Sequence, residues 1–154
     1  ALLKKIDRLK ITANDISYDA LVLAKKNAHI NNVFDKLQVF QGDLFAAIDS
    51  SVHFDFIVSN PPYIDPAYSK RLQPELKFEP KNALFSDNKG RKLPETIIEM
   101  APAYLKKSGI LFMEIADYNS SYLMQKAKRF FTDAKIIQDH NSLNRFVIAA
   151  YPRL

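Results

Sequence analysis

Residues 54–63, FDFIVSNPPY, join the signal of a buried β-strand to a rigid polar turn. The apolar run at residues 54–59 predicts a strand. The two prolines after it fix their own φ near about −65° and push the residue before each of them into extended backbone. Asn60 is therefore expected to lie at the end of a strand with little conformational freedom.

This turn presents two hydrogen-bond acceptors on a preset backbone. The side-chain oxygen of Asn60 and the carbonyl of Pro61 can hold the N–H bonds of a planar amide or amine, so that its lone pair points at a methyl carbon. Pro62 stiffens the turn, and Tyr63 offers an aromatic face to the planar group. The pattern indicates methyl transfer to a planar nitrogen. The plainer alternative is that the prolines only end the strand and Tyr63 only packs.

Length and composition describe an ordinary globular domain, and we expect one domain over residues 1–154. The chain is 47% apolar with a formal net charge of +5, and no apolar run approaches the roughly 20 residues of a membrane span. With no signal peptide at the first residues, we expect a cytoplasmic protein without a membrane partner. The positive charge permits proximity to RNA or the ribosome, but the basic residues are scattered.

Cysteine and histidine, which are common metal ligands, show no metal-binding pattern in this sequence. The chain has no cysteine, which excludes disulfides, thiolate nucleophiles and thiolate metal ligands. His29, His53 and His140 are far apart in the sequence and lack the spacing of metal ligands. We expect no metal site.

The remaining chain alternates between short apolar runs and amphipathic stretches, as an open α/β sheet does. We expect strands at residues 10–13, 37–41, 54–59, 110–115, 134–138 and 145–151. The last two are joined without a helix and predict an antiparallel hairpin.

Four helices are expected between these strands. The first carries Leu2, Leu3, Ile6 and Leu9, and the last covers residues 121–131. The second is capped by Ser17 and packs through Ala20, Leu21, Leu23, Ala24 and Ala28. The third packs through Ile97, Ile98, Ala101, Tyr104 and Leu105 and ends at a left-handed Gly109. Residues 64–92 are expected to form a long loop.

Several stretches resemble one family of enzymes. FDFIVSNPPYI (54–64) is similar to motif IV of class I methyltransferases that use S-adenosylmethionine and act on planar nitrogens. Residues 9–31 resemble the second strand and following helix of that fold, and LQVFQGDLF (37–45) its third strand and acidic turn. Residues 74–90, with Glu79, Pro80, Ala83 and Leu84, resemble the Glu-Pro-x-x-Ala-Leu segment of HemK-type release-factor glutamine methyltransferases. GILFMEIADYN (109–119) resembles their fifth strand.

The resemblance implies a Rossmann-like class I methyltransferase sheet, with S-adenosylmethionine as cofactor. It assigns the ribose hydroxyls to Asp15, the adenine amino group to Asp43 and the face of the adenine ring to Leu44. It also places Ile16 beside the adenine and gives Asn60 further contact with the cofactor. From the residues alone, Asp15 is more often a turn or cap residue, and residues 42–45 are equally consistent with a plain turn.

The implied reaction methylates the glutamine amide in the Gly-Gly-Gln loop of a peptide chain release factor, with Asn60, Pro61, Pro62 and Tyr63 as catalytic residues. Glu79 either shapes the substrate pocket or is a solvated side chain. Two alternatives stay open at this point. One is an N6-adenine methyltransferase acting on RNA or DNA, and the other is a non-catalytic remnant that binds a partner.

The chain departs from the family's pattern at three places. Ala116 and Asn119 stand where Glu-Ile-Gly-x-x-Gln has glycine and glutamine, and residues 85–90 differ from the family's Gly-x-x-Gly-Leu. The first strand and its glycine-rich turn have no counterpart, because the only glycines are Gly42, Gly90 and Gly109. We therefore expect an N-terminally truncated catalytic domain with two unpaired inner strand edges. Such a chain, alone, should bind the cofactor weakly and be inactive.

Overall fold

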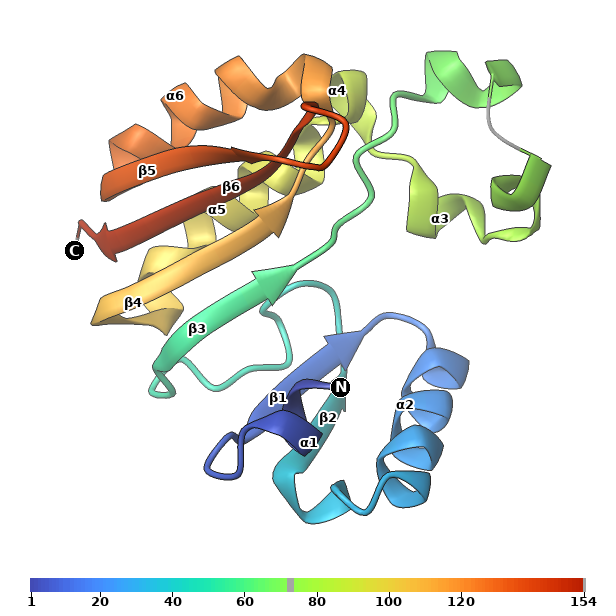
Figure 1. Cartoon of the computed structure of the whole chain (residues 1–154), viewed down its shortest axis with the longest axis vertical. Helices are drawn as coiled ribbons and strands as arrows, with labels where there is room; N and C mark the ends of the chain where they lie inside the picture. Colours follow the sequence, from blue (N-terminus) through green and yellow to red (C-terminus); the bar gives the residue numbers. More distant parts are fainter. Residues whose placement is uncertain (72–73, 154) are drawn as a thin grey trace. The chain divides into compact units, whose positions relative to one another are not determined.

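The computed structural model of this chain describes residues 1–71 and 74–153 (Figure 1). Leu72 and Gln73, which belong to the expected loop, and Leu154 lie outside the described residues. The chain divides into two compact units, Ala1–Asp49 and Ser50–Leu154, and each is described by itself. Within the described ranges, no helix combines the length and apolar character that a membrane span requires.

The first unit, Ala1–Asp49, is a two-stranded parallel sheet packed against one long helix. Strands β1 (Ile11–Asp15) and β2 (Leu37–Gln41) pair in parallel along their whole lengths. Helix α2 (Tyr18–Ile30) packs against both strands, and the 3-10 turn η1 (Phe34–Lys36) leads from it into β2 (Figure 1). The strand expected at residues 37–41 is confirmed with its bounds.

Helix α2 begins where the sequence predicts but packs through fewer residues. The hydroxyl of Ser17 accepts a hydrogen bond from the Ala20 amide at 3.3 Å, which confirms the cap. Leu21 and Ala28 are buried, whereas Leu23 is 57% exposed and Ala20 is exposed too. Including Ala20 and Leu23 in the packing face was wrong, because residues one or two positions from Leu21 lie about 100° or 200° around the helix.

The opening helix is shorter than its apolar spacing predicts. Helix α1 (Leu2–Lys5) ends before Ile6, whose backbone is extended at φ −126° and ψ 102°. Only Leu3 of this segment is buried. A helix this short depends on tertiary packing for its stability. With Leu3 as its single buried side chain, the helix is not stabilised far enough to include Leu9.

The second unit, Ser50–Leu154, contains a four-stranded mixed sheet in the order β3-β4-β6-β5. Its strands are β3 (Phe54–Ser59), β4 (Leu105–Glu114), β5 (Phe131–Gln138) and β6 (Asn144–Pro152). Strands β3 and β4 are parallel, and the β4-β6 and β6-β5 pairs are antiparallel. The strand at residues 54–59 and the C-terminal hairpin are therefore confirmed.

Two helices pack on this sheet and bury its core. Helix α5 (Lys92–Tyr104) contacts β4, and helix α6 (Ser120–Phe130) contacts α5, β5 and β6 (Figure 1). The buried apolar side chains of the helices and strands include Ile97, Ile98, Ala101, Leu105, Leu111, Met113, Leu123, Ala127, Phe131, Val147 and Ala149. The inward positions expected for Ile97, Ile98 and Ala101 are confirmed.

Gly109 does not end a helix. Helix α5 stops at Tyr104, two residues after Pro102, and Gly109 lies inside β4. A Cβ at Gly109 would lie 2.8 Å from both the Leu105 Cβ and the Lys106 carbonyl oxygen. The expectation of a left-handed cap was wrong, because the helix has already ended at Tyr104 and the segment from Leu105 onward pairs with β3. The glycine instead permits a close backbone approach beside the irregular β3-β4 register between Phe54 and Phe56.

The expected loop at residues 64–92 is largely folded into short helical turns. They are η2 (Pro66–Arg71), η3 (Pro74–Phe78), α3 (Lys81–Leu84) and α4 (Asp87–Gly90). The Ile64 amide donates to the Leu84 carbonyl at 3.0 Å, and the Ser86 amide donates to the Ile64 carbonyl at 3.0 Å. These two bonds, formed between distant positions, bring residues 84–86 beside the end of the proline turn.

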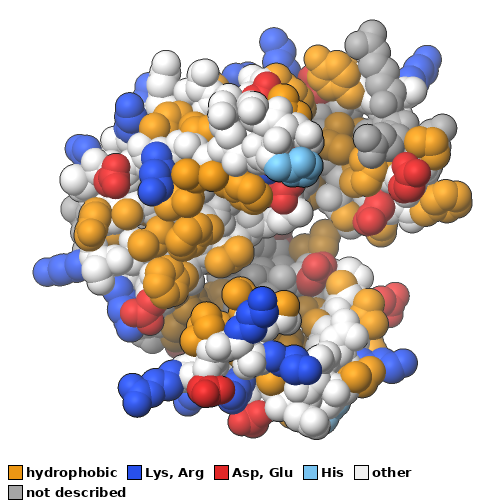
Figure 2. All heavy atoms as spheres, viewed as in Figure 1, with side chains coloured by type: hydrophobic (Ala, Val, Ile, Leu, Met, Phe, Trp, Pro, Cys, Tyr) orange, Lys and Arg blue, Asp and Glu red, His pale blue; other side chains and the backbone are white. Residues whose placement is uncertain are grey.

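Strands β1 and β3 each have one unpaired edge among the described residues. Strand β1 pairs with β2 alone, and β3 pairs with β4 alone. On the face in Figure 2, Lys and Arg side chains are scattered among acidic and apolar ones, as their distribution along the sequence suggests.

Candidate active site

The first cluster of candidate residues lies at the carboxyl ends of β1 and β2. Asp15 is the last residue of β1 and opposes Gln41, the last residue of β2. The Asp15 carboxylate is exposed and accepts the Ser17 amide at 2.8 Å. Ile16 is half exposed. The turn role that the residues alone suggested for Asp15 is thus present, and the carboxylate still faces solvent.

The turn after β2 is tied to the end of β1 by Asn14. The Asn14 side-chain amide donates to the Gly42 carbonyl at 3.3 Å and also to the Leu44 carbonyl. The Gly42 amide donates to the Asp15 carbonyl at 3.1 Å. Leu44 has a left-handed φ of 46°, and the Asp43 side chain is exposed. This role of Asn14 was not predicted from the sequence, although a polar residue near the end of a strand could have indicated it.

These two strand ends therefore present exposed carboxylates from neighbouring parallel strands. Carboxylate oxygens accept hydrogen bonds from hydroxyl and amino groups, and the carboxyl edge of an open parallel sheet is where α/β folds bind ligands. The hydrogen-bond acceptors of Asp15 and Asp43 fit the hydroxyl and amino groups of a nucleoside, with Ile16 and Leu44 as apolar neighbours in the sequence.

The second cluster is the proline turn at the carboxyl end of β3. Asn60 directly follows the strand and is exposed, and Pro61 is buried. The last residue of β3, Ser59, pairs with Met113 of β4. The pairing of β3 with β4 thus brings Tyr63 close to Glu114 at the end of β4, although the two residues are 51 positions apart in the sequence.

Tyr63 is anchored at its hydroxyl by Glu114. The Tyr63 hydroxyl donates to Glu114 Oε1 at 2.7 Å, and this contact is partly buried. Burial, followed by the hydrogen bond and the charge of Glu114, raises the pKa of Tyr63 to about 12, and Arg145 opposes this rise. Glu114 had no assigned role from the sequence, and its contact makes it a residue that orients Tyr63.

Gly90 lies against the backbone carbonyl of Tyr63. It has a left-handed φ of 77° and follows Asn88 and Lys89, which are left-handed too. A Cβ on Gly90 would lie 2.0 Å from the Tyr63 carbonyl oxygen. Only glycine permits this approach, so the segment that differs from the family's Gly-x-x-Gly-Leu touches the candidate site.

Glu79 and Pro80 lie between η3 and α3, and both are exposed. Pro80 is the N-cap residue of α3, and its carbonyl accepts the Ala83 amide at 2.9 Å. The Leu84 carbonyl is the group that pairs with the Ile64 amide. The segment that carries the Glu-Pro-x-x-Ala-Leu pattern therefore folds next to the residue that follows Tyr63.

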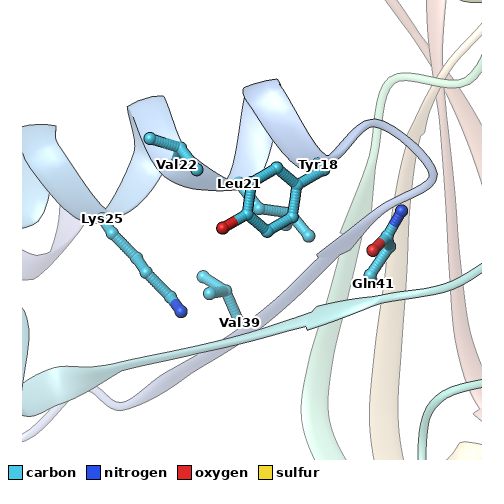
Figure 3. Close-up of a pocket in the computed structure, with 6 residues that line it drawn as sticks. All are labelled: Tyr18, Leu21, Val22, Lys25, Val39 and Gln41. Atoms are coloured by element: carbon cyan, nitrogen blue, oxygen red, sulfur yellow. The ribbon is translucent and has the colours of Figure 1, made fainter.

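A separate hollow of about 240 Å³ lies between α2 and β2. Figure 3 shows Tyr18, Leu21, Val22 and Lys25 on the helix, with Val39 and Gln41 on the strand. None of the expected site residues lines it.

The pKa of Tyr63 provides a test of this geometry. Because the folded state raises this pKa above the ordinary value of 10, the folded protein holds the proton more tightly between pH 10 and 12, and the free energy of unfolding falls as pH rises through that window. The tyrosinate absorbance titration of the wild type minus that of Tyr63→Phe is expected to have its midpoint near pH 12. Glu114→Gln should lower that midpoint. A midpoint at the ordinary value of 10 would show that Tyr63 is neither buried nor bonded as described.

Comparison with known proteins shows the family of this chain. The family model described as Methyltransferase small domain matches residues 1–87. The release factor glutamine methyltransferase of Aquifex aeolicus is 34% identical over 148 residues, which cover 96% of this chain and 52% of that relative. The release factor glutamine methyltransferase of Koribacter versatilis is 33% identical over 152 residues, which cover 98% of this chain and 53% of that relative. The chain spans about half the length of these curated relatives.

Solved structures show the same fold at lower identity. A methyltransferase from Pyrococcus furiosus matches with a TM-score of 0.70 and 17% identity, over 97% of this chain and 66% of that chain. A 16S rRNA N2 methyltransferase of T. thermophilus, solved with AdoMet and guanosine, matches with a TM-score of 0.64 and 16% identity, over 92% of this chain and 31% of that chain. These matches concern the fold alone, and they confirm the Rossmann-like α/β class that the sequence predicts.

Proposed function

Because this chain belongs to the methyltransferase small domain family, we propose that it is part of a catalytic domain whose full-length protein methylates a peptide chain release factor. The methyl donor is S-adenosylmethionine, and the acceptor is the side-chain amide nitrogen of the glutamine in the Gly-Gly-Gln loop. The observation that carries the proposal is the proline turn at the end of β3, with Tyr63 anchored on Glu114. Relatives that are named release factor glutamine methyltransferases support the choice of substrate.

The proline turn positions the nitrogen that is methylated. The Asn60 side-chain oxygen and the Pro61 carbonyl accept the two N–H bonds of the glutamine amide and turn its lone pair away from the turn. The same oxygens stabilise the positive charge that grows on this nitrogen. Near neutral pH, well below its pKa of about 12, Tyr63 is uncharged, and its ring bounds the planar amide. When the new N–C bond forms, the bond between the methyl carbon and the sulfonium sulfur breaks, and its electron pair stays on a sulfur that becomes a neutral thioether. The nitrogen then loses one proton to solvent.

The exposed carboxylates of the first unit fit the nucleoside part of the cofactor. Asp15 accepts the ribose hydroxyls, Asp43 accepts the adenine amino group, and Ile16 and Leu44 contact the ring. When bound, S-adenosylmethionine supplies a methyl group on a sulfonium sulfur, which is already a strong electrophile. The chain's own task is therefore to hold and orient the acceptor, for which no general base is required.

Labelled methyl transfer tests this proposal. The full-length protein, incubated with methyl-labelled S-adenosylmethionine, should label a release factor at the glutamine of its Gly-Gly-Gln loop and leave RNA and DNA unlabelled. A release factor with alanine at that glutamine is the matched control and should stay unlabelled. Label on adenine would instead establish the nucleic-acid alternative, and label on no substrate would favour a non-catalytic protein. A release factor is cytoplasmic and acts at the ribosome, and we propose that this protein meets its substrate there.

A further inference from the structure

Tyr118 holds the backbone that leaves the proline turn. It lies in the 3-10 turn η4 (Asp117–Asn119), after the end of β4. Its hydroxyl donates to the Tyr63 carbonyl at 3.1 Å and accepts the Asp65 amide at 3.2 Å. One hydroxyl thus bonds both backbone groups that flank Ile64.

The remaining polar groups of this short segment are bonded as well. The amide and carbonyl of Ile64 pair with Leu84 and Ser86, each at 3.0 Å. From the Tyr63 carbonyl to the Asp65 amide, every backbone group therefore has a partner, and Tyr118 supplies two of these partners. Since Glu114 holds the Tyr63 hydroxyl, Tyr63 is fixed at its side chain by one residue and at its backbone by another.

The surroundings of Tyr118 argue against a role in core packing. Its residue surface is 54% exposed, and its ring meets Tyr68 at 5.8 Å with a 46° tilt. Removing a hydroxyl from an exposed side chain leaves the freed backbone groups open to water, so the loss of stability should be small. The main consequence should be greater freedom of Tyr63.

Resting on the proposed function, we propose that Tyr118 is a positioning residue for methyl transfer, which acts by fixing the exit of the acceptor turn. The Pro61 carbonyl, one of the two acceptors, lies two residues before the Tyr63 carbonyl that Tyr118 holds. Reactions that depend on the placement of the reactants lose about 100-fold in rate when the geometry shifts by about 1 Å. Tyr118 therefore contributes to turnover without touching the reacting atoms.

The test compares Tyr118→Phe with a matched control, Tyr122→Phe, in the full-length protein. Tyr122 is also a half-exposed tyrosine, and its ring, which phenylalanine keeps, lies 4.3 Å from the Arg91 guanidinium. Tyr118→Phe should lower kcat about 10- to 100-fold with unchanged KM and cofactor affinity and only a small fall in Tm, and Tyr122→Phe should leave kcat unchanged. Hydrogen exchange at the Asp65 amide should become faster in Tyr118→Phe alone.

Two readouts separate this proposal from the proposed function. Equal kcat in wild type and Tyr118→Phe would overturn the positioning role, while wild-type methylation of the release factor would still stand. Absence of methyl transfer by the wild type would count against the proposed function. In that case the exchange rate of the Asp65 amide still tests the role of Tyr118. An unchanged rate in Tyr118→Phe would show that the Tyr118 hydroxyl does not anchor this backbone.

Discussion

Asn60→Ala is expected to lower methyl transfer by the full-length protein by several orders of magnitude, with little change in its affinity for S-adenosylmethionine. The Asn60 side chain is exposed at the end of β3, so its removal should cost little stability. Its oxygen is expected to hold the acceptor nitrogen in the transition state, and the loss should therefore appear in kcat rather than in cofactor binding. Single-turnover methyl transfer and calorimetric titration of the cofactor measure the two quantities.

A matched change elsewhere in the same unit controls for the loss of an exposed asparagine side chain. Asn141 lies in the hairpin turn between β5 and β6, and the hydrogen bond shown for it, to Asp139, uses its backbone amide. Asn141→Ala should therefore keep near-normal turnover. Near-normal turnover of Asn60→Ala as well would remove Asn60 from the catalytic residues.

Gly90→Ala is expected to have the largest effect on stability. The new Cβ would lie 2.0 Å from the Tyr63 carbonyl oxygen and 2.8 Å from its carbonyl carbon. Both neighbours are backbone atoms, which cannot rotate away as a side chain does. Left-handed strain of about 1–2 kcal/mol and overpacking of about 1–3 kcal/mol predict a loss of about 2–5 kcal/mol in the free energy of unfolding. Chemical denaturation measures this loss, and turnover should fall with it because Tyr63 is displaced.

Lys89→Gly is the opposite change in the same turn. Lys89 is exposed and has a left-handed φ of 60°, a conformation that glycine adopts without strain. The free energy of unfolding should therefore stay equal or rise slightly. Similar destabilisation by Lys89→Gly and Gly90→Ala would mean that the turn tolerates no change at all, and that the contact with Tyr63 is not the reason for the glycine.

Local signals predicted the elements whose causes lie within a few residues. The strand Phe54–Ser59 ends just before Asn60 and two prolines, and the strand Leu37–Gln41 ends just before Gly42 and an acidic turn, so the carboxyl end of each strand could be predicted from the sequence. Ser17 caps its helix through a bond to the Ala20 amide, three residues away. Each of these features depends on backbone conformations that neighbouring residues impose.

Errors arose where distant residues decide the conformation. Gly109 was expected to end a helix, but its place in β4 depends on pairing with β3, about fifty residues earlier. The stretch at residues 64–92 was expected to be a loop, but Ile64 pairs with Leu84 and Ser86 across an intervening segment. Sequence periodicity cannot show which distant segments will pair.

The sequence by itself determined the residue chemistry of the candidate site and the backbone of its turn. Proline geometry holds Asn60 at the end of β3, and Asp15 ends β1 beside a capped helix. Only the tertiary structure decided what holds that turn in place. Glu114, Tyr118 and Gly90 come from 27 to 55 residues away from Tyr63 and meet it at its hydroxyl and its carbonyl oxygen. A hydrogen bond or a close backbone approach acts over about 3 Å of space, and only the folded sheet brings such distant parts of the chain within that range.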